Sequence, residues 1–310
     1  MTTASLAFVF PGQGSQAVGM LAELAAAHPE VKATFDEASA GAGRDLWALS
    51  QQGPEEELNR TENTQPALLA ASVAAWRVWQ SVDGALPAML SGHSLGEYSA
   101  LVCAGALSLH DAAGLVAERG RLMQQAVPAG VGAMAAILGG DDDQIAQVCA
   151  EVAQGEIVAP ANFNSPGQLV IAGHAAAVDR AIARLAELGV KKAIRLAVSV
   201  PSHSMLMREA ADRLGERMGT VAWSEPRVPV VQNADAQVHQ GVDAIREALQ
   251  RQLYLPVRWT QCVQALGAAG ITRVVECGPG KVLSGLVKRI DKAIEARPIG
   301  TPDDLAAALA

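Results

Sequence analysis

The chain has 310 residues, half of them hydrophobic and only 4% aromatic, which predicts a layered α/β interior built mainly from Ala, Val, Leu and Ile. This composition excludes a disordered chain, and 32 acidic against 24 basic residues, a formal net charge of −8, argue against nucleic acid as a partner. Four widely spaced cysteines form no C-x-x-C pair, which argues against zinc and against a disulfide framework.

No targeting or membrane-spanning segment is predicted. The opening "MTTASLAFVF" lacks a basic start. The longest weakly polar run, "AVPAGVGAMAAILGG", is too short and too rich in Gly and Pro to cross a bilayer as a helix. We therefore expect a cytoplasmic protein without a membrane partner.

The first predicted strand leads into "FVFPGQGSQA", residues 8–17, which formally matches the G-x-G-x-x-G/A fingerprint of a dinucleotide-binding turn. Such a site needs an acidic residue at the end of the next strand, about twenty residues on. Asp36 has that spacing, but it lies in "PEVKATFDEASAGAG", which predicts a helix. The fingerprint therefore fails on context, and we expect a glycine-flanked loop whose backbone N–H groups, including that of Gln13, point into a cleft.

A later strand leads into Gly92-His93-Ser94-Leu95-Gly96, and a helical pattern follows. This is G-x-S-x-G in the context of a nucleophile elbow, where flanking glycines permit a tight turn that exposes the serine. In that arrangement the N–H of Leu95 faces developing negative charge and His93 lines the pocket. The alternative is a glycine-rich turn with an incidental serine, and the strand-to-helix context favours the nucleophile.

The segment "DAAGLVAERGRLMQQAV" predicts a helix with Asp111 as its N-cap. A guanidinium lies inside its apolar face, because Arg119 falls in the middle of a stripe formed by Leu115, Val116, Leu122, Met123 and Ala126. Its planar set of donors needs an anion there. Two kinds of partner remain open: a structural one, such as Glu97 or helix-end carbonyls, and an anionic group of the substrate.

The order of elements changes between residues 129 and 199. There the predicted order is strand, helix, strand, strand, helix, strand, in "GAMAAILGG", "DDQIAQVCAEVA", "EIVAPANF", "GQLVIAG", "AAVDRAIARLAELG" and "AIRLAVSV". This βαββαβ order is ferredoxin-like. Residues 1–128 and 200–310 instead alternate strands and helices, as a mainly parallel sheet does. We therefore expect an α/β protein in which a small ferredoxin-like subdomain is inserted into a larger domain.

A serine of ordinary pKa needs a base, and His203 stands out among the six histidines. It follows the predicted strand "AIRLAVSV" and Pro201, and it precedes the helical run "MLMREAADRLGERM". A helix N-terminus at that point would lower its pKa and keep it neutral. On the residues alone, a capping or exposed loop histidine is an equally good interpretation.

Several blocks together resemble the malonyl-CoA:acyl carrier protein transacylases of fatty-acid synthesis and the related acyltransferase domains of polyketide synthases. In chain order, to about residue 285, the blocks are "FVFPGQGSQ", "GHSLGEYSAL", "RGRLMQ", "GAMAAILG", "NFNSPGQLVIAG", "SVPSHS", "QLYLPVRW" and "ECGPGKVL". The resemblance implies a hydrolase-like α/β domain with a ferredoxin-like insert. It also implies transfer of malonyl from malonyl-CoA to the phosphopantetheine thiol of an acyl carrier protein, through a ping-pong serine acyl-enzyme.

The resemblance gives each candidate residue a role. Ser94 is the nucleophile, His203 is its base, and the N–H groups of Gln13 and Leu95 form the oxyanion hole. Arg119 binds the free malonyl carboxylate, which supplies the missing anion. The remaining assignments are Gln252, whose neighbourhood orients the histidine, and His93, Asn162 and Gln13 as substrate contacts. No metal and no resident cofactor are implied, since the partner carries phosphopantetheine, and we expect a monomer.

The expected carrier protein is acidic, so an acidic chain needs a local basic patch to receive it. One candidate patch is Lys191 with Lys192, and another is Lys281 with Lys288 and Arg289. Each also fits an ordinary solvated face.

Two positions depart from the family's usual sequence pattern. Leu255 stands where a small polar residue is frequent, and Ser202 occupies a position that tracks the choice between malonyl and methylmalonyl in polyketide acyltransferases. Three rival functions stay open. They are a malonate decarboxylase acyltransferase subunit, a carboxylesterase, for which Arg119 is unexplained, and a non-catalytic acyl-binding protein.

Overall fold

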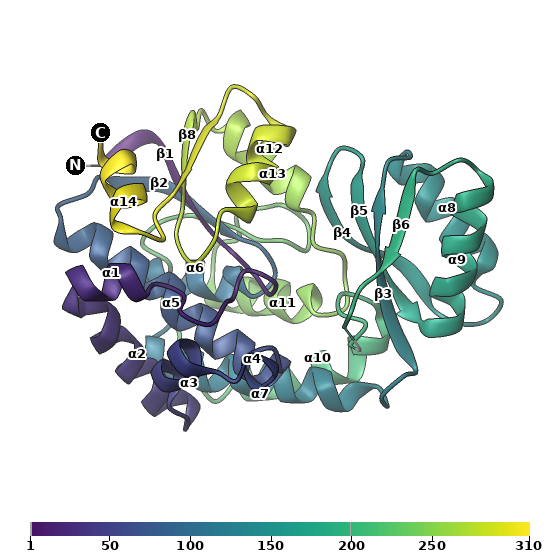
Figure 1. Ribbon diagram of the computed structural model, residues 1–310, viewed down its shortest axis with the longest axis horizontal. Coiled ribbons are helices and arrows are strands. Elements are labelled where there is room, and N and C mark those ends of the chain that lie inside the picture. Colours follow the sequence, from purple (N-terminus) through teal and green to yellow (C-terminus); the bar gives the residue numbers. More distant parts are fainter. Residues whose placement is uncertain (1, 199) are drawn as a thin grey trace.

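A computed structural model describes residues 2–198 and 200–310 and contains two separate β-sheets (Figure 1). The parallel sheet has the strand order β7-β2-β1-β8-β9, with β1 Thr2–Phe10, β2 Leu86–Gly92, β7 Val230–Val231, β8 Arg273–Glu276 and β9 Glu295–Pro298. The antiparallel sheet has the order β4-β5-β3-β6, with β3 Gly132–Leu138, β4 Val158–Ser165, β5 Gln168–His174 and β6 Lys192–Arg195. The predicted mixed α/β class, with a parallel sheet, is confirmed.

Helices cover both sheets. Those before β3 are α1 Ala22–Ala27, α2 Pro29–Ala42, α3 Leu46–Gln52, α4 Glu55–Leu58, α5 Thr61–Ser81, α6 Gly96–Cys103 and α7 Leu109–Ala126. The later ones are α8 Asp142–Val152, α9 Ala175–Glu187, the 3₁₀ turn η1 Met205–Met207, α10 Arg208–Met218, α11 Val242–Gln252, α12 Trp259–Ala268, α13 Val282–Ile290 and α14 Pro302–Leu309. Within the described residues no helix is both long and apolar enough to span a bilayer.

The parallel sheet is buried on both faces, as the alternation of side chains along β1 shows. Leu6, Phe8 and Phe10 join the apolar cluster of α5 and α7, and the Phe8 ring lies 5.2 Å from each of the rings of Trp76 and Trp79. Ala7 and Val9 belong to a second cluster, formed with α12 and α13 on the other face. Because the β1 side chains from Leu6 to Phe10 all have apolar neighbours, this part of the strand is a continuous hydrophobic run.

Three loops meet at one edge of this sheet. Strands β7, β2 and β1 are neighbours and pair in parallel, so their carboxyl ends lie at the same edge. The Gln13 loop follows β1, Ser94 follows β2, and Asn233 follows β7. Ser94 and Asn233, which are 139 positions apart in the chain, are thereby brought within hydrogen-bond distance.

The antiparallel sheet lies to one side of the molecule, with α8 and α9 packed on it (Figure 1). Its elements run β3-α8-β4-β5-α9-β6, which is the predicted order. It is joined to the rest through β4, where Phe163 N–H donates to Val257 O at 2.9 Å and Val257 N–H donates to Ala161 O at 2.8 Å. Strand β4 therefore lies against the segment that leads into α12.

Two predicted boundaries are wrong. The strand expected over 193–200 ends at Arg195, because β6 is an edge strand and the chain leaves it so that Pro201 packs on Gly132; residue 199 lies outside the described residues. The N-cap of α7 is Ser108, whose hydroxyl accepts from Asp111 N–H at 3.0 Å, so Asp111 lies within the first turn.

Candidate active site

Ser94 lies on a tight turn between β2 and α6, as the motif predicts. Its φ of 52° is in the left-handed region, which is strained for a residue with a side chain. The turn requires glycine on both sides: a Cβ on Gly92 would lie 1.9 Å from the carbonyl carbon of Gly96, and one on Gly96 would lie 2.0 Å from Phe10 O. The backbone thus presents Ser94 at the end of the sheet.

His203 contacts this serine directly. Its Nε2 lies 2.8 Å from Ser94 Oγ, and its Nδ1 lies 2.7 Å from the main-chain oxygen of Gln252. Since a carbonyl only accepts, Nδ1 carries the proton and Nε2 is free to accept one from Ser94. The structure therefore brings together the predicted pair and gives the histidine a backbone carbonyl as its partner.

The pKa of His203 is lowered to about 3, first by burial and then by the positive charge of Arg119. The side chain is 4% exposed. The expected cause was a helix N-terminus, but α10 begins only at Arg208 and His203 lies before the 3₁₀ turn. Desolvation of a buried imidazole, and not a helix dipole, keeps this histidine neutral.

Arg119 projects from α7 into the same site. It is 2% exposed, and it donates from Nη1 to Gln65 Oε1 at 2.7 Å and from Nη2 to Gln252 Oε1 at 3.0 Å. Its Nη2 also lies 3.4 Å from Ser94 Oγ, and its guanidinium carbon lies 5.5 Å from the centre of the Tyr98 ring. In the described part of the chain no carboxylate lies within ion-pair distance of it.

The alternative ion pair between Arg119 and Glu97 is not formed. The Glu97 carboxylate is fully buried and accepts from Gln232 Nε2 at 2.9 Å, from Asn233 N–H at 2.7 Å and from Gln252 Nε2 at 3.2 Å. Burial raises its pKa to about 7, although these bonds act in the opposite direction. Arg119 thus keeps a positive charge with only neutral hydrogen-bond partners.

Gln252, the last residue of α11, links the other groups. Its side-chain Nε2 donates to Ser94 O at 2.8 Å, its Oε1 accepts from Arg119, and its main-chain oxygen holds His203. One residue therefore fixes the positions of the serine, the arginine and the histidine.

The GQG loop lies beside the serine turn. Gly12 packs so closely on His93 that a Cβ there would lie 2.5 Å from His93 O. Gln13 donates from Nε2 to Thr61 Oγ1 at 3.3 Å. Within residues 2–198 and 200–310, the backbone N–H groups of Gln13 and Leu95 donate to no protein acceptor. Both groups are thus available to an oxygen of a bound substrate.

The two remaining predicted contacts are placed differently. His93 Nε2 lies 2.8 Å from Asn164 Oδ1, and its ring centre lies 5.6 Å from that of Trp259. Asn162 is 7% exposed in β4 and forms a bridge with Val257. Among the residues described, no hydrogen bond joins its side chain to Ser94 or His203, and its main chain lies beside Val257, where β4 meets the rest of the protein.

Comparison with known proteins shows what this site belongs to. Residues 7–298 match the acyl transferase domain family. The chain is 58% identical over 303 residues to the malonyl CoA-acyl carrier protein transacylase of Escherichia coli, covering 98% of each. The chain belongs to the malonyl-CoA:acyl carrier protein transacylase family. It is therefore an acyltransferase.

Solved structures of the family agree. The transacylase of Xanthomonas oryzae is 67% identical and superposes with a TM-score of 0.99, covering 100% of this chain and 98% of that one. A malonyl-transacylase in complex with a type II polyketide acyl carrier protein is 55% identical, with a TM-score of 0.97 and coverage of 98% and 99%. The match extends over both sheets.

Three residues of this family member's site are not predicted from its sequence. Asn233 contacts the Ser94 backbone, Gln65 accepts from Arg119, and Asn164 contacts His93. The only local signal for Asn233 is the polar run "QNADAQ" directly after an apolar pair. The sheet order determines that this pair lies beside β2, and no local sequence pattern predicts the sheet order.

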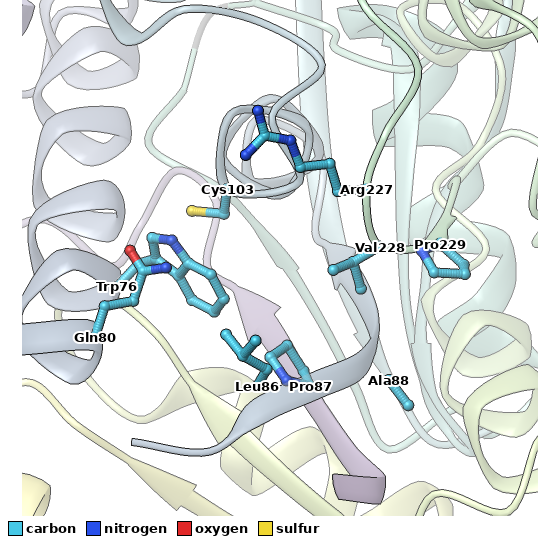
Figure 2. Close-up of a pocket in the computed structure, with 9 residues that line it drawn as sticks. All are labelled: Trp76, Gln80, Leu86, Pro87, Ala88, Cys103, Arg227, Val228 and Pro229. Carbon is cyan, nitrogen blue, oxygen red and sulfur yellow. The ribbon is translucent and has the colours of Figure 1, made fainter. Parts of the chain in front are cut away.

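A cavity of about 630 Å³ lies elsewhere in the fold (Figure 2). It is lined by Leu86 and Pro87 at the start of β2, by Cys103 at the end of α6, and by Trp76 and Arg227. Since Ser94 follows the other end of β2, this cavity is at the opposite edge of the sheet from the serine and takes no part in the site described above. In the described part of the chain no cluster of three or more His, Cys, Asp or Glu side chains could hold a metal ion.

Proposed function

We propose that this chain transfers the malonyl group of malonyl-CoA to the phosphopantetheine thiol of an acyl carrier protein for fatty-acid synthesis. The names of its relatives support this substrate pair. The observation that carries the proposal is the buried Arg119, which lies 3.4 Å from Ser94 Oγ with only neutral partners. A substrate carboxylate is the natural complement of that charge.

The proposed reaction is ping-pong. Ser94 Oγ attacks the thioester carbonyl while its proton passes to His203 Nε2, and the negative oxygen accepts from the N–H groups of Gln13 and Leu95. The C–S bond then breaks, and the coenzyme A thiolate takes the proton from His203. In the second half, the pantetheine thiol gives its proton to His203 and attacks the malonyl-serine ester, and Ser94 recovers that proton as it leaves.

Arg119 sets the acyl specificity in this proposal. Its guanidinium binds the free malonyl carboxylate, and Gln252 and Gln65 hold it in place. His93 and Asn162 are the further substrate contacts that we propose. Gln252 also supports the base, since its main-chain oxygen accepts from His203 Nδ1.

We further infer that residues 1–128 and 200–310 form a hydrolase-like domain, and residues 129–199 a ferredoxin-like subdomain; residues 1 and 199 lie outside the described residues. The serine turn at the end of β2 supports the first assignment, and the element order together with the sheet order β4-β5-β3-β6 supports the second. We also propose that the protein is a cytoplasmic monomer without a resident cofactor.

Intact mass after brief incubation with malonyl-CoA tests the proposal. We expect a malonyl adduct on the wild type and none on Ser94→Ala. Addition of acyl carrier protein bearing phosphopantetheine should remove the adduct and leave a malonylated carrier, whereas carrier protein without that group should not. A wild type that forms no adduct would show that the acyl-enzyme route is wrong for this chain.

A further inference from the structure

Asn233 holds the serine turn from both sides. Its Oδ1 accepts from Ser94 N–H at 2.7 Å, and its Nδ2 donates to Gly92 O at 2.7 Å. It is fully buried, and both distances are short for bonds between neutral groups. A single amide thus binds the backbone residues on the two sides of His93, in the middle of the elbow.

The main chain of Asn233 is held equally firmly. Its N–H donates to Glu97 Oε2 at 2.7 Å, and its carbonyl oxygen accepts from Arg258 N–H at 3.1 Å. The same carboxylate oxygen accepts from Gln252 Nε2 at 3.2 Å. Glu97 therefore ties the residue that holds the nucleophile to the residue that orients the histidine and the arginine.

The turn needs such support because of its conformation. With a φ of 52°, Ser94 occupies a region that costs free energy in an L-residue unless surrounding contacts impose it. Asn233 supplies that contact without touching the reacting Oγ. Its position after β7, the strand beside β2, brings it to the turn.

We propose that Asn233 is a positioning residue for acyl transfer, whose amide holds Ser94 in its reactive conformation. This inference rests on the proposed role of Ser94 as nucleophile. Without the amide, Ser94 N–H and Gly92 O lose their partners, and the turn relaxes to conformations in which Oγ no longer faces His203 Nε2.

A serine-directed fluorophosphonate tests this proposal without using malonyl-CoA. Ser94 Oγ attacks phosphorus while its proton passes to His203 Nε2, and fluoride leaves. The labelling rate, mapped to Ser94 by peptide mass, therefore reports the reactivity of the turn. We expect Asn233→Ala to lower that rate roughly ten- to hundredfold, the range expected for release of one strained residue. The kcat for malonyl transfer should fall by a similar factor, with little change in the KM for malonyl-CoA.

Thr34→Ala is the matched control for lost stability. Thr34 is fully buried in α2, away from the site, and its hydroxyl donates to Glu30 O at 2.7 Å. We expect this variant to lose thermal stability while its Ser94 labelling rate stays at the wild-type value. If Asn233→Ala is labelled as fast as the wild type, or if Thr34→Ala is slowed as much at an equal loss of Tm, the proposal is overturned.

Asn233→Asp decides the question if Asn233→Ala does not fold. It keeps an acceptor for Ser94 N–H but replaces the donor to Gly92 O, so labelling should still be slower than in the wild type. A wild-type labelling rate for Asn233→Asp would then overturn the proposal. A wild type that is labelled at Ser94 but forms no malonyl adduct would refute the proposed substrate and leave the role of Asn233 standing.

Discussion

The guanidinium of Arg119 lies with its Nη2 3.4 Å from the hydroxyl of Ser94, while its shorter hydrogen bonds go to the neutral amides of Gln65 and Gln252. Burial lowers the pKa of Arg119, but an arginine still remains charged at neutral pH. A buried cation beside a nucleophile is stable only if other groups compensate for its lost hydration. Here the amides do so in part, and a carboxylate on the acyl group would complete the compensation.

Replacing Arg119 should therefore change which acyl group is accepted. We expect Arg119→Ala to lower kcat/KM for malonyl-CoA by roughly ten- to 150-fold, the equivalent of about 1.5–3 kcal/mol for a hydrogen bond to a charged group. Acetyl-CoA, which lacks the carboxylate, should gain relative to malonyl-CoA. The rates of acyl-enzyme formation with both thioesters, followed by intact mass, measure this. Gln124→Ala, an exposed position on the same helix, should match the wild type, and an equal loss with both thioesters would contradict the assignment.

Gln252 acts in the site through its side chain and through its main-chain oxygen, and a substitution separates the two roles. The Gln252→Ala substitution removes the side-chain bonds to Arg119 and to Ser94 O but keeps the main-chain oxygen that holds His203. We expect kcat/KM for malonyl-CoA to fall about tenfold, with a smaller loss for acetyl-CoA, because the histidine keeps its orientation. The same pair of acylation rates measures this. A larger loss for acetyl-CoA than for malonyl-CoA would show that the amide acts mainly on the base.

The low pKa of His203 predicts an unusual pH profile. A base must be neutral to accept a proton, and with a pKa of about 3 His203 stays neutral well below the ordinary histidine value of 6.5. We therefore expect that protonation of His203 does not slow the acylation of Ser94 near pH 6.5. The acylation rate should show no decline with a midpoint at that pH. Single-turnover acylation between pH 5 and 8 tests this, and His203→Ala should be slower by roughly 10²–10⁴-fold throughout. A wild-type midpoint at 6.5 that the variant lacks would contradict the prediction.

Local patterns predicted those parts of the site that depend on neighbours in sequence. The helical period placed Arg119 in a buried stripe, and the glycines of the G-x-S-x-G pattern placed Ser94 on a turn between a strand and a helix. The resemblance to the family added Gln252, which no periodicity indicates. Asn233 could not be predicted, because its role depends on a two-residue strand taking its place beside β2.

The same distinction explains the errors in the fold. The strand expected over 193–200 has the right alternation, but β6 lies at the sheet edge and pairs only with β3, over Ala135–Leu138. Glu97 is one of the structural partners for Arg119 that the sequence leaves open. Three donors of Gln232, Asn233 and Gln252 instead satisfy its carboxylate. Competition between donors from distant segments decides such pairings. Its outcome cannot be predicted from the order of residues along the chain.

Glu97 should make the folded state less stable as the pH rises. Its pKa is about 7 in the fold against an ordinary value of 4.5, so between these values the folded state binds the proton that the unfolded state releases. Stability is then fully present below pH 4.5 and is lost as the pH rises through 7. The size is on the order of 3 kcal/mol, and it would be larger without the nearby charge of Arg119, which lowers the pKa of Glu97.

Glu97→Gln tests this, because glutamine does not titrate. The variant loses an acceptor for one of its three donors, which lowers the free energy of unfolding by a constant amount. Urea unfolding from pH 4.5 to 8 should show the wild type losing stability relative to Glu97→Gln as the pH rises. His203, whose lowered pKa destabilises the fold as the pH falls below 6.5, contributes to both proteins and cancels. A constant difference across this range would show that Glu97 is ionised throughout.

The basic residues of α13 offer a test of carrier-protein docking. Lys281 precedes this helix, and Lys288 and Arg289 lie in its last turn, all exposed. Arg289 donates to Gln168 Oε1 at 3.0 Å, which joins α13 to β5, so the two lysines are the better choice for substitution.

We expect Lys281→Glu with Lys288→Glu to raise the KM for an acidic carrier protein roughly three- to tenfold at low salt, because surface charges mainly steer association. The effect should shrink as ionic strength rises. Transfer back to coenzyme A as the acceptor should keep its wild-type KM. Lys191→Glu with Lys192→Glu, which makes the same change of charge at the start of β6, is the matched control. If the substitutions at Lys281 and Lys288 raise the KM for coenzyme A equally, their effect is on the site and not on docking. If only the substitutions at Lys191 and Lys192 raise the KM for the carrier protein, that protein binds at the edge of the antiparallel sheet.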